Sequence, residues 1–114
     1  MALASIHAQD FKARLSEANS ERDIREFYSK FGDSREAFYT SGNIKLFALW
    51  VQPKDRAGAT FLWLYLLRSG RWHLLVDHPE TGEFAGDSVT ISVVDGTVRL
   101  ISPDGHVTKT YEIR

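Results

Sequence analysis

The run Phe61–Leu67, FLWLYLL, is apolar on both sides, and this constrains the possible folds more than any other segment. Side chains alternate between the two faces of a β-strand. One face of this run carries Phe61, Trp63, Tyr65 and Leu67, and the other carries Leu62, Leu64 and Leu66. Strands of this kind are buried on both faces. Helices could cover one face, so the other needs a sheet that curls on itself, a ligand cavity or a partner.

Three dipeptides indicate tight hairpin turns. They are Ser69-Gly70, Asp95-Gly96 and Asp104-Gly105, and each can supply the positive backbone φ of a two-residue turn. The strand-like runs around them are Ile44–Gln52, Thr60–Arg68, Arg71–Asp77, Ser88–Asp95, Thr97–Ser102 and His106–Ile113. Because tight hairpins join antiparallel neighbours, we expect one β-meander over about residues 43–113. The last three runs alternate apolar and polar residues, which predicts one face in water.

The N-terminal part has helical periodicity. A first helix is predicted over about residues 5–19, where apolar residues recur along one stripe. A second helix begins after Ser20, with Asp23 three residues later in a capping arrangement, and ends near Gly32. Its apolar face, which we expect to pack on the sheet, consists of Ile24, Phe27, Tyr28 and Phe31. Residues 33–42 follow neither pattern and indicate a turn or a short helix.

Length and composition fit one folded domain. The 114 residues are 43% hydrophobic and 25% charged, as in ordinary globular proteins. We therefore expect a single α+β domain over residues 1–114, with two N-terminal helices (about 5–31) packed on a curved, mostly antiparallel six-stranded β-meander. The chain has no cysteine, which excludes disulfides, thiolate metal ligands and thiol nucleophiles. We expect no cofactor.

The start of the sequence lacks the pattern of a signal peptide. The longest apolar run is too short to cross a bilayer as a helix. These features predict a cytoplasmic protein with no membrane partner.

Aromatic residues are concentrated in the first half of the predicted meander. Aromatic side chains dominate protein interfaces and ligand pockets, and they also fill ordinary cores. The candidate binding residues are Trp50, Phe61, Trp63, Tyr65, Trp72, Arg68 and Arg71.

Residues 71–80, RWHLLVDHPE, contain the densest group of acid–base side chains. Regular alternation would place His73 and Asp77 on one face, with Leu75 between them, and His78 on the other. A positioned histidine–carboxylate pair can act as a general base. His73, Asp77 and His78 are therefore the candidate catalytic residues, and a surface group without a role is the alternative. We expect no metal site, because no further histidine lies near them in sequence.

A basic set could bind single-stranded RNA through charge and stacking. It consists of Lys54, Arg56, Arg68 and Arg71, with the indole of Trp72 beside them. The net charge of −1 and the lack of an RNA-binding motif favour a solvated hairpin tip instead. We therefore expect no nucleic-acid partner.

Residues 59–80 resemble the closing hairpin of NTF2-like (SnoaL-like) domains. In that family a long apolar strand leads through a glycine turn to a strand of the form Gly-x-Trp-x-apolar that ends near Asp-His. The matching positions here are Gly70, Trp72, Leu74, Val76, Asp77 and His78. The resemblance implies a cone in which helices pack into a curved sheet around a pocket. Members include isomerases, dehydratases, small-molecule binders and association domains, and they are often dimeric. The three strand-like runs after residue 80 depart from the family pattern.

Two main functional hypotheses follow. The first is a non-catalytic binding or interaction module, because apolar surface is in surplus and reactive groups are few. It would bind a protein partner or a second copy, as a homodimer, through the aromatic strands between Ile44 and Val76. The second is an NTF2-like binder of a small apolar ligand, or an enzyme, with its acid–base residues inside a cone-shaped pocket. RNA binding is a third and weaker hypothesis.

Overall fold

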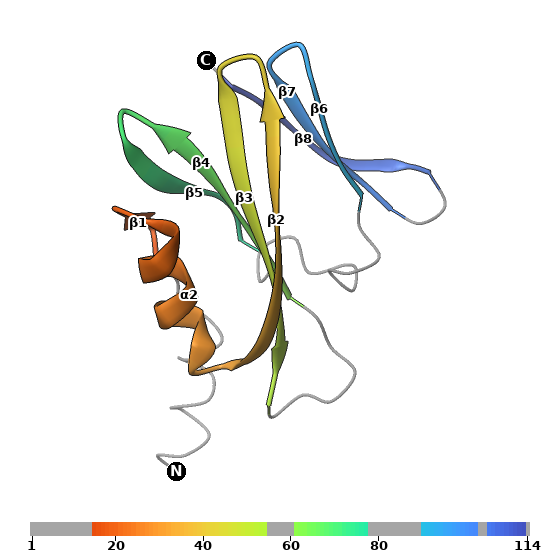
Figure 1. Cartoon of the computed structure of the whole chain (residues 1–114). Coiled ribbons are helices and arrows are strands. Elements are labelled where there is room, and N and C mark those ends of the chain that lie inside the picture. The colour runs from red at the N-terminus through yellow and green to blue at the C-terminus, as the bar shows by residue number, and fades with distance from the viewer. Residues whose placement is uncertain (1–14, 55–60, 78–89, 103–104, 114) are drawn as a thin grey trace.

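The computed structural model describes residues 15–54, 61–77, 90–102 and 105–113 (Figure 1). The elements in this part of the chain are β1 (Glu17–Ala18), α2 (Glu21–Ser29), β2 (Gly32–Ser41), β3 (Ile44–Pro53), β4 (Phe61–Arg68), β5 (Arg71–Asp77), β6 (Thr90–Val94), β7 (Thr97–Ile101) and β8 (Val107–Glu112). The strands form two antiparallel sheets, with the orders β1-β5-β4-β3-β2 and β6-β7-β8.

Turn residues set two of the hairpins. Ser69 and Gly70 join β4 to β5 with φ angles of 55° and 76°, and Asp95 and Gly96 join β6 to β7 with φ angles of 50° and 77°. Positive φ at both central residues is typical of a type I′ turn, whose twist matches that of paired strands. These two hairpin predictions are confirmed. The third predicted turn lies partly outside the described residues.

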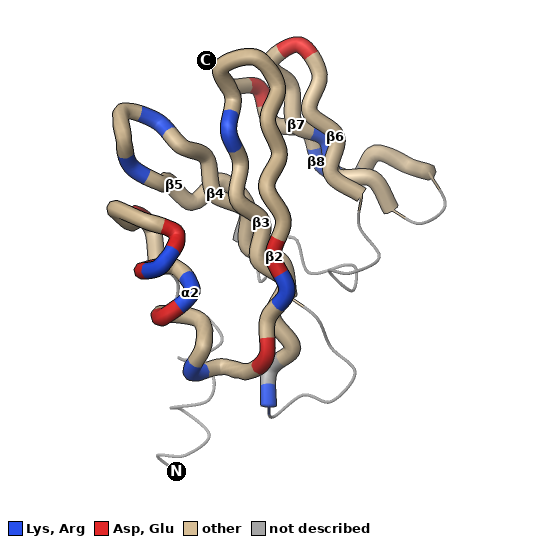
Figure 2. The backbone as a smooth tube through the Cα atoms, viewed as in Figure 1, with Lys and Arg blue, Asp and Glu red and all other residues tan. Residues whose placement is uncertain are grey.

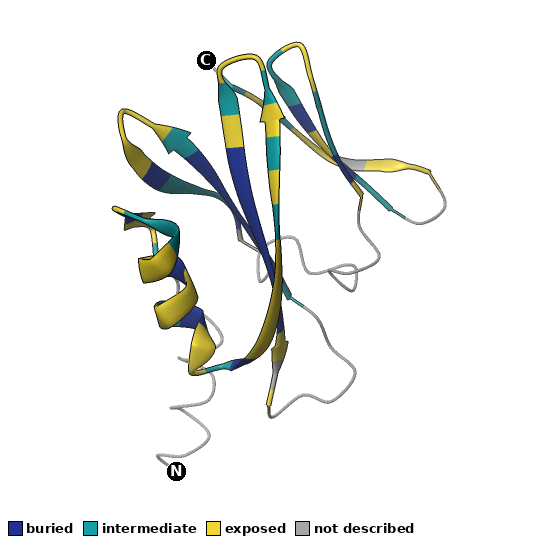
Figure 3. Cartoon of the chain, viewed as in Figure 1, coloured by how far each residue is buried: buried dark blue, intermediate teal, exposed yellow. Residues whose placement is uncertain are grey.

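Two apolar layers cover the two faces of the five-stranded sheet (Figure 3). On one face α2 packs onto the sheet, and we call this layer the helix-side core. Its buried residues are Ala18, Ile24, Tyr28, Phe47, Leu49, Val51, Trp63, Tyr65 and Trp72. On the other face lies the three-stranded sheet, and we call this layer the inter-sheet core. Its buried residues are Leu46, Ala48, Trp50, Leu62, Leu64, Leu66, Val76, Ile91, Val98 and Leu100.

The sequence of β4 explains why both layers exist. Trp63 and Tyr65 lie in the helix-side core, whereas Leu62, Leu64 and Leu66 lie in the inter-sheet core. Burying each large apolar side chain contributes on the order of 1.5–3 kcal/mol. The chain itself therefore covers both faces of β4, with a helix on one side and a second sheet on the other.

Polar groups fix α2 at both its start and its buried face. The Ser20 hydroxyl accepts a hydrogen bond from the Asp23 N–H at 3.3 Å, which confirms the predicted cap. The Tyr65 hydroxyl donates to the Leu15 carbonyl at 2.6 Å. The Tyr28 hydroxyl is therefore the donor in its 2.7 Å contact with Tyr65, and it accepts from the Leu15 N–H at 3.3 Å. This closed ring ties the segment before β1 to both the helix and the sheet.

The expected fold class is wrong. The described residues contain one helix, and residues 17–18 of the first predicted helix form strand β1. Most of that predicted helix lies outside the described residues. The strands form two sheets instead of one six-stranded meander, so the fold is mostly β. A single curved sheet would leave one face of β4 uncovered, and the three alternating strands β6–β8 supply the apolar face that covers it.

The segment 33–42, expected as a turn or short helix, lies almost entirely in β2, which pairs along its length with β3. β2 is the outer strand of its sheet, and most of its side chains are exposed. A strand exposed on both faces lacks the alternation that identifies strands in a sequence. All six strands that were predicted are present as β3–β8, each within two residues of its predicted ends. No helix in the described part of the chain is long and apolar enough to cross a membrane.

Candidate functional site

Most aromatic residues of the candidate binding set lie in the two cores. Trp63, Tyr65 and Trp72 belong to the helix-side core, with exposed fractions of 3%, 0% and 4%. Phe61 is partly buried against the same core, and Trp50 is 6% exposed in the inter-sheet core. These rings hold the fold together, and a binding role for them stays a prediction. Trp50 also borders an open groove.

That groove has a volume of about 330 Å³, and we call it the β2–β6 groove. It is lined by Arg35, Glu36, Ala37, Tyr39, Trp50, Thr90 and Ile91. Arg35, Ala37 and Tyr39 alternate along β2 and so share the face that looks towards the small sheet. Arg35 lies opposite Trp50 in the strand pairing, and its guanidinium carbon lies 4.7 Å from the centre of a Trp50 ring. This distance is within the range of a cation–π interaction.

Charges on β2 are divided between its two faces. The Glu36 carboxylate accepts hydrogen bonds from the Arg25 guanidinium at 2.6 Å and 2.7 Å, and these bonds raise the pKa of Arg25. This ion pair ties α2 to the helix side of β2. On the groove side, burial raises the pKa of the Tyr39 hydroxyl, and the nearby Arg35 cation partly offsets that rise. The Tyr39 hydroxyl is therefore protonated at neutral pH and can donate a hydrogen bond.

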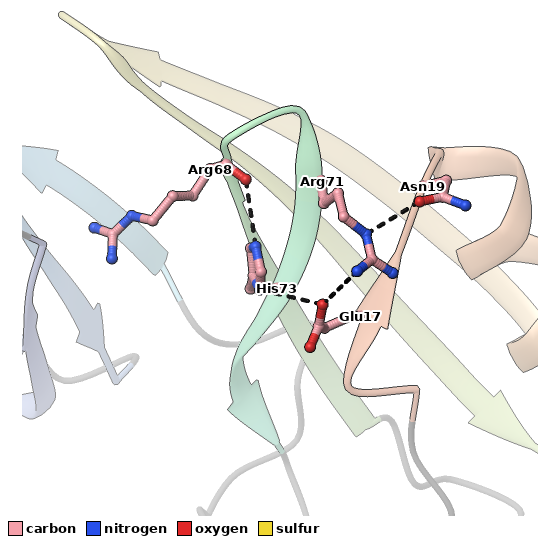
Figure 4. Close-up of polar contacts among 5 residues, drawn as sticks. All are labelled: Glu17, Asn19, Arg68, Arg71 and His73. Carbon is pink, nitrogen blue, oxygen red and sulfur yellow. Dashed lines mark hydrogen bonds and ion pairs between the residues drawn. The ribbon is translucent and has the colours of Figure 1, made fainter.

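A second polar cluster lies at the end of the β4–β5 hairpin (Figure 4). The Arg71 guanidinium donates to the Glu17 carboxylate at 2.8 Å and to the side-chain oxygen of Asn19 at 3.1 Å. His73 Nδ1 lies 3.9 Å from the same carboxylate, and its Nε2 lies 3.3 Å from the Arg68 carbonyl oxygen. All five residues reach solvent. Exposed ion pairs of this kind contribute at most about 1 kcal/mol, so the cluster fastens β1 to β5 only weakly.

Sequence reasoning missed two members of this cluster, Glu17 and Asn19. Both fall in the first predicted helix, where they would serve as ordinary solvent-facing residues. Their role depends on the pairing of β1 with β5, which places Glu17 opposite His73. No local pattern in the sequence indicates that long-range pairing.

The expected geometry of His73 and Asp77 is wrong. The pairing of β4 with β5 shifts register once and leaves Leu75 as an extra residue in β5. A β-bulge of this kind interrupts the alternation of side chains. His73 lies opposite Leu66, a residue of the inter-sheet core, whereas Asp77 lies opposite Trp63, a residue of the helix-side core. The two positions therefore do not follow each other on one face.

Two of the other predicted acid–base and basic residues have no described position. His78 and Arg56 lie outside the described residues. Lys54 is exposed just after β3, at the opposite end of the sheet from Arg68 and Arg71 (Figure 2). The basic side chains of the RNA hypothesis thus form no single patch in the described part of the chain. A catalytic role for the three acid–base residues stays a prediction.

Comparison of this chain with protein-family models, with curated proteins and with solved structures finds no match. The resemblance to NTF2-like domains stays a prediction. The described residues form a mostly-β domain in which β2 is an exposed edge strand and a groove lies beside it. These are the two features at which another molecule could bind.

Proposed function

We propose that the protein is a non-catalytic interaction module that forms a homodimer by pairing β2 with β2 of a second copy. The outer edge of β2 carries this proposal (Figure 1). β2 is ten residues long, pairs on one side with β3 and, among the described residues, pairs with no strand on the other. Such an edge presents a row of backbone donors and acceptors to which another strand can add. Two five-stranded sheets would then form one continuous sheet.

The turn between β2 and β3 determines which backbone groups are available. Gly42 and Asn43 form a two-residue connection, with Ser41 opposite Ile44. In such a hairpin the flanking pair exchanges both of its backbone hydrogen bonds. Counting back in twos, the odd-numbered residues of β2 bond to β3. The even-numbered residues direct their N–H and C=O groups outward, and these include Ser34, Glu36, Phe38 and Thr40.

The second half of β2 lacks the usual protection of an edge strand. Charged side chains discourage strand addition, and they occur at Asp33, Arg35 and Glu36, all in the first half (Figure 2). Residues 37–41 carry no charge. Phe38 is 53% exposed even though its ring centre lies 4.8 Å from that of the Phe47 ring. The uncharged half is therefore the part of β2 that is least protected against the addition of another strand.

Symmetry limits the register of the pairing. A two-fold axis perpendicular to the sheet keeps every side chain on its own face. Residues that lie opposite each other share a face, so one residue of β2 must lie opposite the same residue of the second copy, with the axis between them. An axis at Arg35 or Glu36 would place like charges opposite each other, which is unfavourable. An axis at Phe38 avoids this but pairs fewer residues. An axis at Ala37 pairs nearly all of the strand, with Arg35 opposite Tyr39 of the second copy and Glu36 opposite its Phe38.

Sedimentation equilibrium over about 1–100 µM protein tests the proposal. We expect the mass of two chains. Thr40→Pro removes an outward N–H and leaves the β2–β3 hydrogen bonds in place, so it should raise the dissociation constant of the dimer at least about tenfold. Thr40→Ala is the matched control, because it shortens the same exposed side chain and keeps the N–H. The mass of a single chain for the wild type, or an unchanged mass for Thr40→Pro, would contradict the proposal.

A further inference from the structure

The β2–β6 groove contains a cation without an acidic partner among the described residues. The guanidinium carbon of Arg35 lies over a Trp50 ring, 4.7 Å from its centre, and Arg35 is exposed. Glu36, the adjacent carboxylate, is held by Arg25 on the helix side of β2. A guanidinium carries its N–H donors around its rim, in the plane of the group. Those donors form the planar fork that binds a carboxylate through two parallel hydrogen bonds.

A neutral hydrogen-bond donor lies on the same face of β2. The Tyr39 hydroxyl has no hydrogen-bond partner within the described ranges, and the Arg35 cation acts on it electrostatically. Ala37 lies between these two residues along the strand and lines the groove with a single methyl group. The groove therefore offers one positive charge and one hydroxyl donor, separated by a small residue.

The groove also has apolar lining residues. Trp50 and Ile91 are both nearly buried residues of the inter-sheet core, and each has part of its surface in the groove. Thr90 of β6 also lines the groove. A volume of about 330 Å³ is at the lower end of the range of small-molecule sites, about 300–1,000 Å³. Few converging polar groups above an apolar floor are typical of such sites.

We propose that the β2–β6 groove binds a small monocarboxylic acid with an apolar body. Arg35 binds the carboxylate through two N–H···O bonds, Tyr39 donates to the ligand, and Trp50 and Ile91 contact its body. The single cation matches the single charge of a carboxylate. A phosphate dianion would leave a charge without a partner in a partly dry groove, which is costly. The site lies within one chain and does not depend on the proposed dimer.

The probe is 3-phenylpropionate, and 3-phenylpropionamide is its neutral control. Binding is followed by the backbone amide shifts of Ala37, Tyr39 and Ile91 in two-dimensional ¹H–¹⁵N NMR. We expect saturable shifts at these amides, with a dissociation constant below about 5 mM for the acid and at least about tenfold weaker binding of the amide. Arg35→Gln should weaken binding of the acid at least about tenfold and leave binding of the amide unchanged.

Arg22→Gln is the matched control, because Arg22 is exposed on α2, pairs with Glu26 and lies outside the groove. It removes the same charge and should leave binding of the acid unchanged. The proposal is overturned if acid and amide bind equally, if Arg22→Gln weakens binding as much as Arg35→Gln, or if no groove amide shifts up to about 10 mM acid. The mass of each variant, measured alongside, shows whether the dimer fails, whereas the amide shifts show whether the groove fails.

Discussion

The helix-side core and the inter-sheet core cover the same sheet in different ways. The helix-side core consists largely of aromatic rings, such as Tyr28 and Trp63 with ring centres 4.6 Å apart, and the Tyr28–Tyr65–Leu15 hydrogen bonds complete it. The inter-sheet core is mainly aliphatic, and at β2 it opens into the groove. One short helix can close a face when large rings fill the space around it. The small sheet leaves the β2 margin open, so the candidate binding features lie there.

The largest effect is expected in the inter-sheet core. Leu64 is fully buried in the middle of β4, and its side chain lies between the two sheets. Leu64→Ala should lower the free energy of unfolding by about 2–5 kcal/mol, because it removes buried methyl groups and leaves a cavity. Urea unfolding followed by tryptophan fluorescence measures this change. A loss below about 1 kcal/mol would show that the small sheet does not cover this face in solution.

A smaller effect is expected in the helix-side core. Tyr65→Phe removes one hydroxyl and leaves the Leu15 carbonyl and the Tyr28 hydroxyl without that partner. We expect a loss of about 1–3 kcal/mol, because groups that lose their partner in a buried site carry the cost of desolvation. Tyr39→Phe is the matched control, since the Tyr39 hydroxyl lies in the open groove. Equal losses of unfolding free energy in the two variants would show that the Tyr28–Tyr65–Leu15 ring is not formed.

The sequence carries more information about local elements than about their assembly. The two glycine turns and the cap at Ser20 follow from residue chemistry within a few positions, so they could be predicted. The two-faced pattern of β4 showed that two covers were needed. It could not show that β6–β8 form the second cover, because covering a face depends on contacts between residues far apart in the chain. β2 was missed because an exposed edge strand has no apolar face of its own.

Less of the candidate sites than of the fold could be predicted from the sequence. Arg68, Arg71 and His73 were expected at one hairpin and do lie together there, but their partners come from β1. The bulge at Leu75 could not be foreseen, because nothing in the sequence of β5 departs from a regular strand. Arg35 and Tyr39 were missed as candidates, since their place in the groove depends on β2 forming beside β6.

The most direct test of the open β2 margin is a disulfide across the proposed two-fold axis. The chain has no cysteine, so a single introduced thiol can only pair with that of another copy. In the proposed register Ala37 meets Ala37 of the second copy at about 4.5 Å between Cα atoms, which a disulfide can span. Under mild oxidation Ala37→Cys should form a covalent dimer on a non-reducing gel, and the exposed control Ser34→Cys should not. Equal cross-linking of the two variants, or none by Ala37→Cys, would contradict the account.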